Sequence, residues 1–120
     1  MYKRADLYKR LYDYALEIVG YIDSLPKDST TQTIGKQLLR SGTSVTANVI
    51  EAGSASSKKD YINFFTHALK SANESKFWIS LLMDSGKSKS KNANILLKET
   101  GEIANILGAS IKTMKNSLPK

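Results

Sequence analysis

The chain lacks cysteine and has one histidine, one tryptophan and two prolines in 120 residues. Without cysteine it can form neither a disulfide nor a thiolate metal site. The single histidine, His67, argues against a histidine-based metal centre or catalyst, because such sites combine several ligands or partners. A cysteine nucleophile and a glycine-rich phosphate loop before a helix are also missing. We therefore expect no catalytic residues, no metal and no cofactor, and a protein that is not an enzyme.

Long apolar runs are also absent. No stretch approaches the roughly 20 apolar residues that a membrane span requires. The basic residues near the N-terminus are not followed by the apolar segment of a signal peptide. We expect a cytoplasmic protein without membrane contact, and a length of 120 residues suits one domain spanning residues 1–120.

Positive charge is in excess, with a formal net charge of +7 and an isoelectric point near 9.6. Such a surplus raises the local concentration of phosphate polyanions and speeds their encounter with the protein. RNA or DNA is therefore the natural candidate partner. The alternative is that the charge only keeps a small protein soluble.

Apolar residues recur at alternating spacings of three and four, which predicts four amphipathic helices. The first covers about residues 4–25 and ends before Pro26, and the second runs from the capping oxygens at 28–30 to about residue 55. The third is about 28 residues long and ends at Gly86, and the fourth covers about residues 92–117. Short connections force neighbouring helices to be antiparallel. The sequence therefore predicts an all-α, up-down-up-down four-helix bundle.

Two polar stripes depart from a generic bundle. Polar residues spaced four and three positions apart form one stripe on the second predicted helix, and polar residues form a similar stripe on the third. If the stripes face each other, their members must be hydrogen-bonded, because an unpaired buried polar group costs ~1–3 kcal/mol. We interpret them as a structural network with Arg40 as the counter-charge, either between helices or between subunits. Its predicted members are Arg40, Ser44, Asn48, Glu51, Ser71 and Glu74.

A catalytic or metal-binding role for Glu51 and Glu74 is the competing interpretation of these stripes. Metal-binding bundles of the diiron type supply several Glu residues and Glu-x-x-His motifs from facing helices. Here Ser75, Lys76 and Phe77 follow Glu74, so the motif is missing. The pattern favours the structural interpretation.

Cations close together in the sequence are the predicted phosphate contacts. The predicted set is Arg4, Lys9, Arg10, Lys58, Lys59, Lys87, Lys89 and Lys91. Beside the first of them, Tyr8 and Tyr12 are four residues apart and could stack on unpaired bases. Subunit contact or packing at the edge of the core is the favoured interpretation of the two tyrosines, because tyrosine is common at interfaces.

Glycines occur inside the predicted helices at heptad spacing. Gly35 and Gly42 form one pair, and Gly101 and Gly108 form another. Each glycine within a helix costs ~1 kcal/mol relative to alanine. The pairs therefore predict close helix approach, within the bundle or between protomers.

The middle of the chain resembles a known family. The residues that carry the resemblance are Gln37, Leu38, Arg40, Ser44, Asn48, Glu51, Gly53, the run Lys58-Lys59-Asp60-Tyr61, Ala68, Ser71 and Glu74. This pattern resembles the S23 ribosomal proteins, also called 23S rRNA intervening-sequence proteins. Four differences from the family pattern are mild for the fold: Ser41 replaces alanine, Ala52 is inserted before Gly53, Tyr61 replaces phenylalanine, and Leu69-Lys70 replaces a common Arg-Gly pair.

The resemblance implies a four-helix bundle that assembles into a homo-oligomer, typically a pentamer. It leaves the function open, because the ribosomal name reflects gene location. A similar bundle is the accessory variability determinant of diversity-generating retroelements, which implies a reverse transcriptase as a further candidate partner. We expect a basic, oligomeric, non-enzymatic protein that binds RNA or DNA through phosphate contacts. The alternative is a protein-protein interaction scaffold with no nucleic-acid role.

Overall fold

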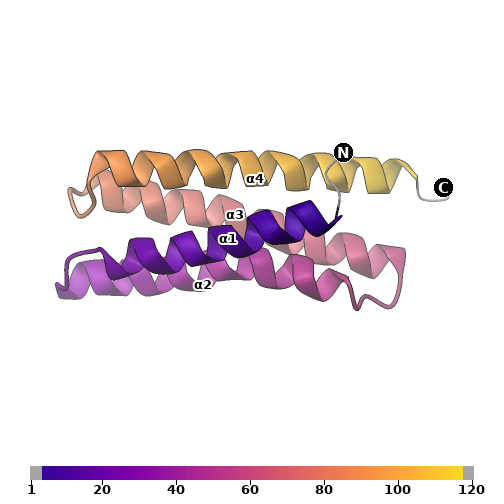
Figure 1. Ribbon diagram of the computed structural model, residues 1–120, viewed down its shortest axis with the longest axis horizontal. Coiled ribbons are helices and arrows are strands. Elements are labelled where there is room, and N and C mark those ends of the chain that lie inside the picture. Colours follow the sequence, from indigo (N-terminus) through magenta and orange to yellow (C-terminus); the bar gives the residue numbers. More distant parts are fainter. Residues whose placement is uncertain (1–3, 118–120) are drawn as a thin grey trace.

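The computed structural model describes residues 4–117, which form four α-helices and no strand (Figure 1). The outermost residues of the predicted 1–120 domain, 1–3 and 118–120, lie outside this description. The helices are α1 (Arg4–Asp23), α2 (Ser29–Ala52), α3 (Lys58–Asp84) and α4 (Ser90–Asn116). They lie side by side in a bundle of 51 × 24 × 22 Å. The prediction of an all-α, up-down-up-down bundle is confirmed for these residues.

The loops divide between the two ends of the bundle. Figure 1 shows the α1–α2 and α3–α4 loops at one end, and the α2–α3 loop at the other, beside the start of α1 and the end of α4. Residues near the start of α3 therefore lie a bundle length away from residues near its end. None of the helices in the described part of the chain is long and apolar enough to cross a membrane.

Side-chain caps fix where α2 and α3 begin. The Asp28 carboxylate accepts hydrogen bonds from the Thr31 hydroxyl at 2.7 Å and the Thr31 backbone N–H at 3.2 Å. These bonds favour the charged form and lower the pKa of Asp28 to about 2. Ser57 Oγ accepts from the Asp60 backbone N–H at 3.0 Å in the same way. Both starts follow from N-cap chemistry.

The end of α3 is a Schellman turn. The Gly86 N–H donates to the Met83 carbonyl and the Lys87 N–H donates to the Leu82 carbonyl. Gly86 has φ 78°, a conformation that glycine adopts without a Cβ penalty. The cap residue itself is Ser85, one position before the predicted Gly86.

Other helix ends differ by a few residues from the sequence-based bounds. The first helix ends at Asp23, where the next two N–H groups turn back to α1 carbonyls before Pro26. The second ends at Ala52 because the following Gly/Ser segment forms tight turns. The fourth begins at Ser90, so Lys91, predicted in a loop, lies in its first turn.

The core contains the apolar positions that the helix periodicity predicted, with Tyr14 near its middle. Tyr14 is fully buried, and its hydroxyl pairs with Thr100 Oγ1 at 2.7 Å. Burial raises the pKa of Tyr14 to about 12. Ile34 and Tyr61 are only partly buried, and their neighbours Gly35 and Ile62 take the inward positions.

Gly42 is a position where α1 approaches α2 tightly. A Cβ added at Gly42 would lie 2.8 Å from Cδ1 and 2.9 Å from Cγ1 of Ile18, which is fully buried. The prediction of close approach is confirmed at this position. Gly35 has ordinary contact distances, and a Cβ at Gly101 or Gly108 would meet nothing within 4 Å. The α4 glycines therefore make no close approach inside the described chain.

We expect Gly42→Ala to lower the free energy of unfolding by up to ~2 kcal/mol. Overpacking against Ile18 costs ~1–3 kcal/mol, and alanine returns ~1 kcal/mol of helix propensity. Gly101→Ala is the matched control and is expected to stabilise by up to ~1 kcal/mol, because nothing opposes its Cβ. Denaturant unfolding of both variants measures the difference. Equal stability of the two variants would contradict the inferred packing.

Candidate nucleic-acid interface

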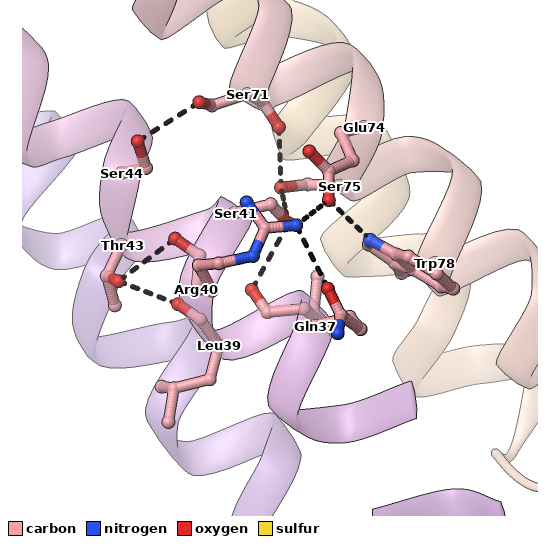
Figure 2. A network of polar contacts seen from close by, with 11 residues as sticks. Gln37, Leu39, Arg40, Ser41, Thr43, Ser44, Ser71, Glu74, Ser75 and Trp78 are labelled. Carbon is pink, nitrogen blue, oxygen red and sulfur yellow. Dashed lines mark hydrogen bonds and ion pairs between the residues drawn. The ribbon is translucent and has the colours of Figure 1, made fainter. Parts of the chain in front are cut away.

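Pairs of serine hydroxyls join α2 to α3 (Figure 2). Ser71 Oγ donates to Ser44 Oγ at 3.1 Å, and the fully buried Ser41 and Ser75 share a hydrogen bond of 2.8 Å. Asn48 Nδ2 donates to the backbone carbonyl of Ser44 at 2.8 Å and to its hydroxyl at 2.9 Å. The predicted members Ser44, Asn48 and Ser71 are therefore brought together, with Ser41 and Ser75 as deeper neighbours. Matched small polar pairs of this kind fix the register of two helices.

Arg40, Glu74 and Trp78 form the outer part of the same seam (Figure 2). The Arg40 guanidinium donates to Glu74 Oε2 and, at 3.0 Å, to Gln37 Oε1. Trp78 Nε1 donates to the same Glu74 oxygen at 2.8 Å. The Trp78 hydrogen bond, with the Arg40 hydrogen bond and charge, lowers the pKa of Glu74. Glu74 thus stays ionised and holds the indole ring in place.

Glu51 lies outside this network, contrary to the prediction. It is exposed, and its carboxylate makes no hydrogen bond or ion pair with the described residues. Continuing the register of the Ser44–Ser71 pair by seven residues along both antiparallel helices brings Glu51 opposite Phe64. A phenyl ring offers no hydrogen-bonding partner, so the carboxylate turns to solvent. His67 is likewise exposed.

The predicted phosphate contacts do not converge on one surface. Arg4, Lys58 and Lys59 lie at the end of the bundle that carries the α2–α3 loop, whereas Lys87, Lys89 and Lys91 lie at the opposite end (Figure 1). The bundle is 51 Å long, so the two groups are separate sites. Lys87 and Lys89 line a depression between the two loops at their end.

Several of these cations already have partners within the bundle. Lys9 pairs with Asp13 at 3.0 Å, and Lys87 pairs with Asp28 at 3.3 Å. Arg4 lies over the Tyr61 ring and donates to its hydroxyl, while Lys58 donates to the Ser117 hydroxyl. Exposed contacts of this kind contribute ~0–1 kcal/mol and exchange readily for a phosphate.

Arg10 is different because it joins α1 to α4. Its guanidinium donates to both carboxylate oxygens of Glu99, at 2.9 and 2.6 Å, and to Glu102 at 3.1 Å. Arg10 and Glu99 are mostly buried, with exposed side-chain fractions of 24% and 23%. A fork-like pair in such a position is strong and specific. Arg10 therefore has a structural role in joining α1 to α4, and its guanidinium is already engaged by two carboxylates.

A second set of lysines does share one surface. On α4, Lys91, Lys98, Asn105 and Lys112 are seven residues apart and all exposed, so they form one row opposite the core. On α3, Asn63, Lys70, Phe77 and Asp84 form a similar exposed row, on the side away from the serine pairs that face α2. Because α3 and α4 pack side by side, the two rows border one surface, here called the basic face. Its lysines are the four in the rows and one exposed lysine a turn beyond each row, Lys59 before Asn63 and Lys115 after Lys112: Lys59, Lys70, Lys91, Lys98, Lys112 and Lys115.

The basic face has little internal charge compensation. None of its lysine side chains makes a hydrogen bond or ion pair with another described residue. Asp84 is the single acidic residue in the two rows. The other carboxylates nearby face away from the basic face: Glu74 is paired with α2, and Glu99 and Glu102 are paired with α1. The sequence offered one signal for this face, the heptad spacing of Lys91, Lys98 and Lys112. Because cations are frequent throughout the chain, this spacing does not stand out in the sequence.

The opposite side of the bundle is apolar. Of the eight large hydrophobic residues that are exposed in the described chain, five lie on the outer sides of α1 and α2: Tyr12, Leu16, Val19, Leu39 and Ile50. We call this the apolar face. Tyr12 is 59% exposed there, away from the basic face, whereas Tyr8 is partly buried and its hydroxyl has no hydrogen-bond partner among the described residues. The pair of tyrosines therefore does not form a stacking surface among cations.

Comparisons with known proteins agree on one family. The model of the 23S rRNA-intervening sequence protein family matches residues 3–109. A crystal structure of a Bacteroides thetaiotaomicron protein of unknown function from the S23 ribosomal protein family is similar, with 33% sequence identity and a TM-score of 0.83. The similarity covers 88% of this chain and 98% of that one. None of the curated proteins is detectably similar in sequence to this chain.

Proposed function

The chain belongs to the 23S rRNA-intervening sequence protein family, and we propose that it is a non-enzymatic protein that binds RNA or DNA through phosphate contacts. The observation that supports this proposal is the basic face. Six lysines without partners among the described residues flank an elongated surface whose two rows hold one carboxylate. The α4 row alone extends about 31 Å from Lys91 to Lys112, at ~1.5 Å per residue.

Phosphate binding follows from the chemistry of this face. Lysine ammonium groups on flexible stems contact phosphates as point charges, and each contact releases a condensed counterion from the nucleic acid. Such contacts position the protein without reading base edges. We therefore propose affinity with little base readout.

We further propose that the protein assembles with copies of itself through the apolar face. Exposed apolar patches on soluble proteins mark sites of protein contact. With the apolar face against another copy, the basic face on the opposite side of the bundle stays accessible to nucleic acid. A pentamer, as the resemblance implies, would combine the basic faces of five subunits.

The apolar face also favours a second candidate function, an interaction scaffold for another protein. A reverse transcriptase is the partner that the resemblance implies. A protein partner that remains bound after nuclease treatment, together with no affinity for nucleic acid, would support the scaffold function.

Binding across a salt series tests the proposed function. The purified, nuclease-treated protein is titrated with structured RNA and with duplex DNA, and its mass is measured by light scattering on the same sample. We expect micromolar or tighter binding by an oligomer. The logarithm of the binding constant should fall with log[salt] at a slope of ~−0.9 per neutralised phosphate on duplex DNA. No binding even at low salt would overturn the nucleic-acid proposal, and a monomeric mass would overturn the oligomer.

A further inference from the structure

Phe77 is the large apolar side chain in the two rows that border the basic face. It is 57% exposed and stands one heptad from both Lys70 and Asp84 on α3. The other members of the two rows are lysine, asparagine or aspartate. An exposed phenyl ring among lysines resembles the way single-strand binding proteins combine a charged track with aromatic platforms.

The Phe77 ring is supported from behind. It contacts the Trp78 ring edge to face, with centroids 4.8 Å apart and an interplanar angle of 62°. Trp78 is held by its hydrogen bond to Glu74, which Arg40 holds in turn (Figure 2). The polar seam between α2 and α3 thereby fixes one neighbour of Phe77 and restricts the positions that the phenyl ring can take.

Phe77 also lies at the height of Lys98. The hydrogen bond from Lys58 to Ser117 shows that these two residues lie at the same height of the bundle. Counting nineteen residues forward from Lys58 leads to Phe77, and counting nineteen residues back from Ser117 leads to Lys98. Because both helices rise equally per residue, Phe77 and Lys98 lie at the same height. One turn away, a Cβ at Gly101 would meet nothing within 4 Å, so the surface beside Phe77 is open.

We propose that Phe77 stacks on an unpaired base of a nucleic acid whose phosphates are held by Lys70 and Lys98. The basic face would then prefer single-stranded to duplex RNA or DNA, because paired bases do not offer a free face to a side chain. This inference rests on the proposed function and adds its substrate class. Stacking is tolerant of base identity, so little sequence preference is expected.

The test uses Trp78, the single tryptophan of the chain, as a reporter beside Phe77. The full-length protein is titrated with a single-stranded oligonucleotide and with an abasic strand of equal length, which keeps the phosphates and removes the bases. We expect the oligonucleotide to quench Trp78 fluorescence and to bind roughly tenfold more tightly than the abasic strand, in line with the stacking contribution of one base. Affinity for both strands is also measured by a method independent of fluorescence.

Three variants complete the test. Phe77→Leu is expected to lower affinity for the oligonucleotide to that for the abasic strand, with the same salt slope, whereas Phe77→Tyr keeps the difference. Ile95→Ala removes an equally exposed apolar side chain without a ring from α4, 61% exposed, and is expected to change the affinity for neither strand. Circular dichroism confirms that each variant is folded.

The possible failures are distinguishable. If the oligonucleotide and the abasic strand bind the wild-type protein equally, or Phe77→Leu keeps the preference for bases, the stacking role of Phe77 is wrong and phosphate binding stands. If neither strand binds at low salt, the proposed function fails and the inference fails with it.

Discussion

Replacing three lysines of the basic face together, Lys70→Glu, Lys98→Glu and Lys112→Glu, is expected to weaken RNA binding on the order of 100-fold at ~0.1 M salt. Each change removes a cation that holds a phosphate and adds a repelling carboxylate. The magnitude of the salt slope should therefore fall by about 3, because three phosphates are no longer neutralised. All three side chains are exposed and without partners in the described chain, so stability should change by less than ~0.5 kcal/mol per site.

The matched control separates surface position from net charge. Lys9→Glu, Lys27→Glu and Lys36→Glu change the formal net charge of +7 by the same −6, to +1, but on α1, in the α1–α2 loop and on α2. We expect affinity to fall by less than about tenfold for this control, because long-range attraction is screened beyond a Debye length of ~10 Å. Filter binding of both triple variants to one RNA measures the difference. Equal decreases would show that net charge, rather than the basic face, determines binding.

The basic face shows which part of the candidate site could not be predicted from the sequence. Local clusters such as Lys87, Lys89 and Lys91 are visible as a run, but a run near a loop spreads over one end of a bundle. Lys70 and Lys98 are 28 positions apart in the chain and border the same surface only because α3 and α4 pack side by side. The tertiary partners of a side chain likewise cannot be predicted from the sequence, and Arg10 is the clearest example. Its carboxylate partners lie about 90 residues away.

The fold itself was much more predictable. Apolar spacing and capping residues such as Asp28, Ser57 and Gly86 determine the helices locally, so their order and approximate bounds follow from the sequence. The polar stripe on α2 was identified by its spacing alone. Which residues of this stripe join the network depends on the side chain that faces each of them on α3. That Phe64 lies opposite Glu51 could not be predicted without the register of the two helices.

Arg10→Ala is expected to lower the free energy of unfolding by about 2–3 kcal/mol. Breaking a buried ion pair from one side costs ~3–5 kcal/mol because the remaining charge is left unpaired, and the partial exposure of Glu102 reduces this cost. Burial and the charge of Glu99 already raise the pKa of Glu17. Without Arg10, three carboxylates would share the α1–α4 seam. A destabilisation of this size corresponds to a decrease in Tm of roughly 8–12 °C, at ~4 °C per kcal/mol for a domain of 120 residues.

A double-mutant cycle checks that the effect arises from this ion pair. Glu99→Gln with Glu102→Gln removes the charges that Arg10 neutralises, so Arg10→Ala in that background should cost much less than in the wild type. An equal cost in both backgrounds would show that Arg10 acts through its apolar stem.

RNA binding by Arg10→Ala distinguishes a structural role of Arg10 from a phosphate contact. If Arg10→Ala remains folded and binds RNA within about twofold of wild type, the α1 arginine joins helices while the lysines of α3 and α4 hold phosphates. A tenfold decrease in affinity at unchanged salt slope would instead show that the α1–α4 seam shapes the basic face.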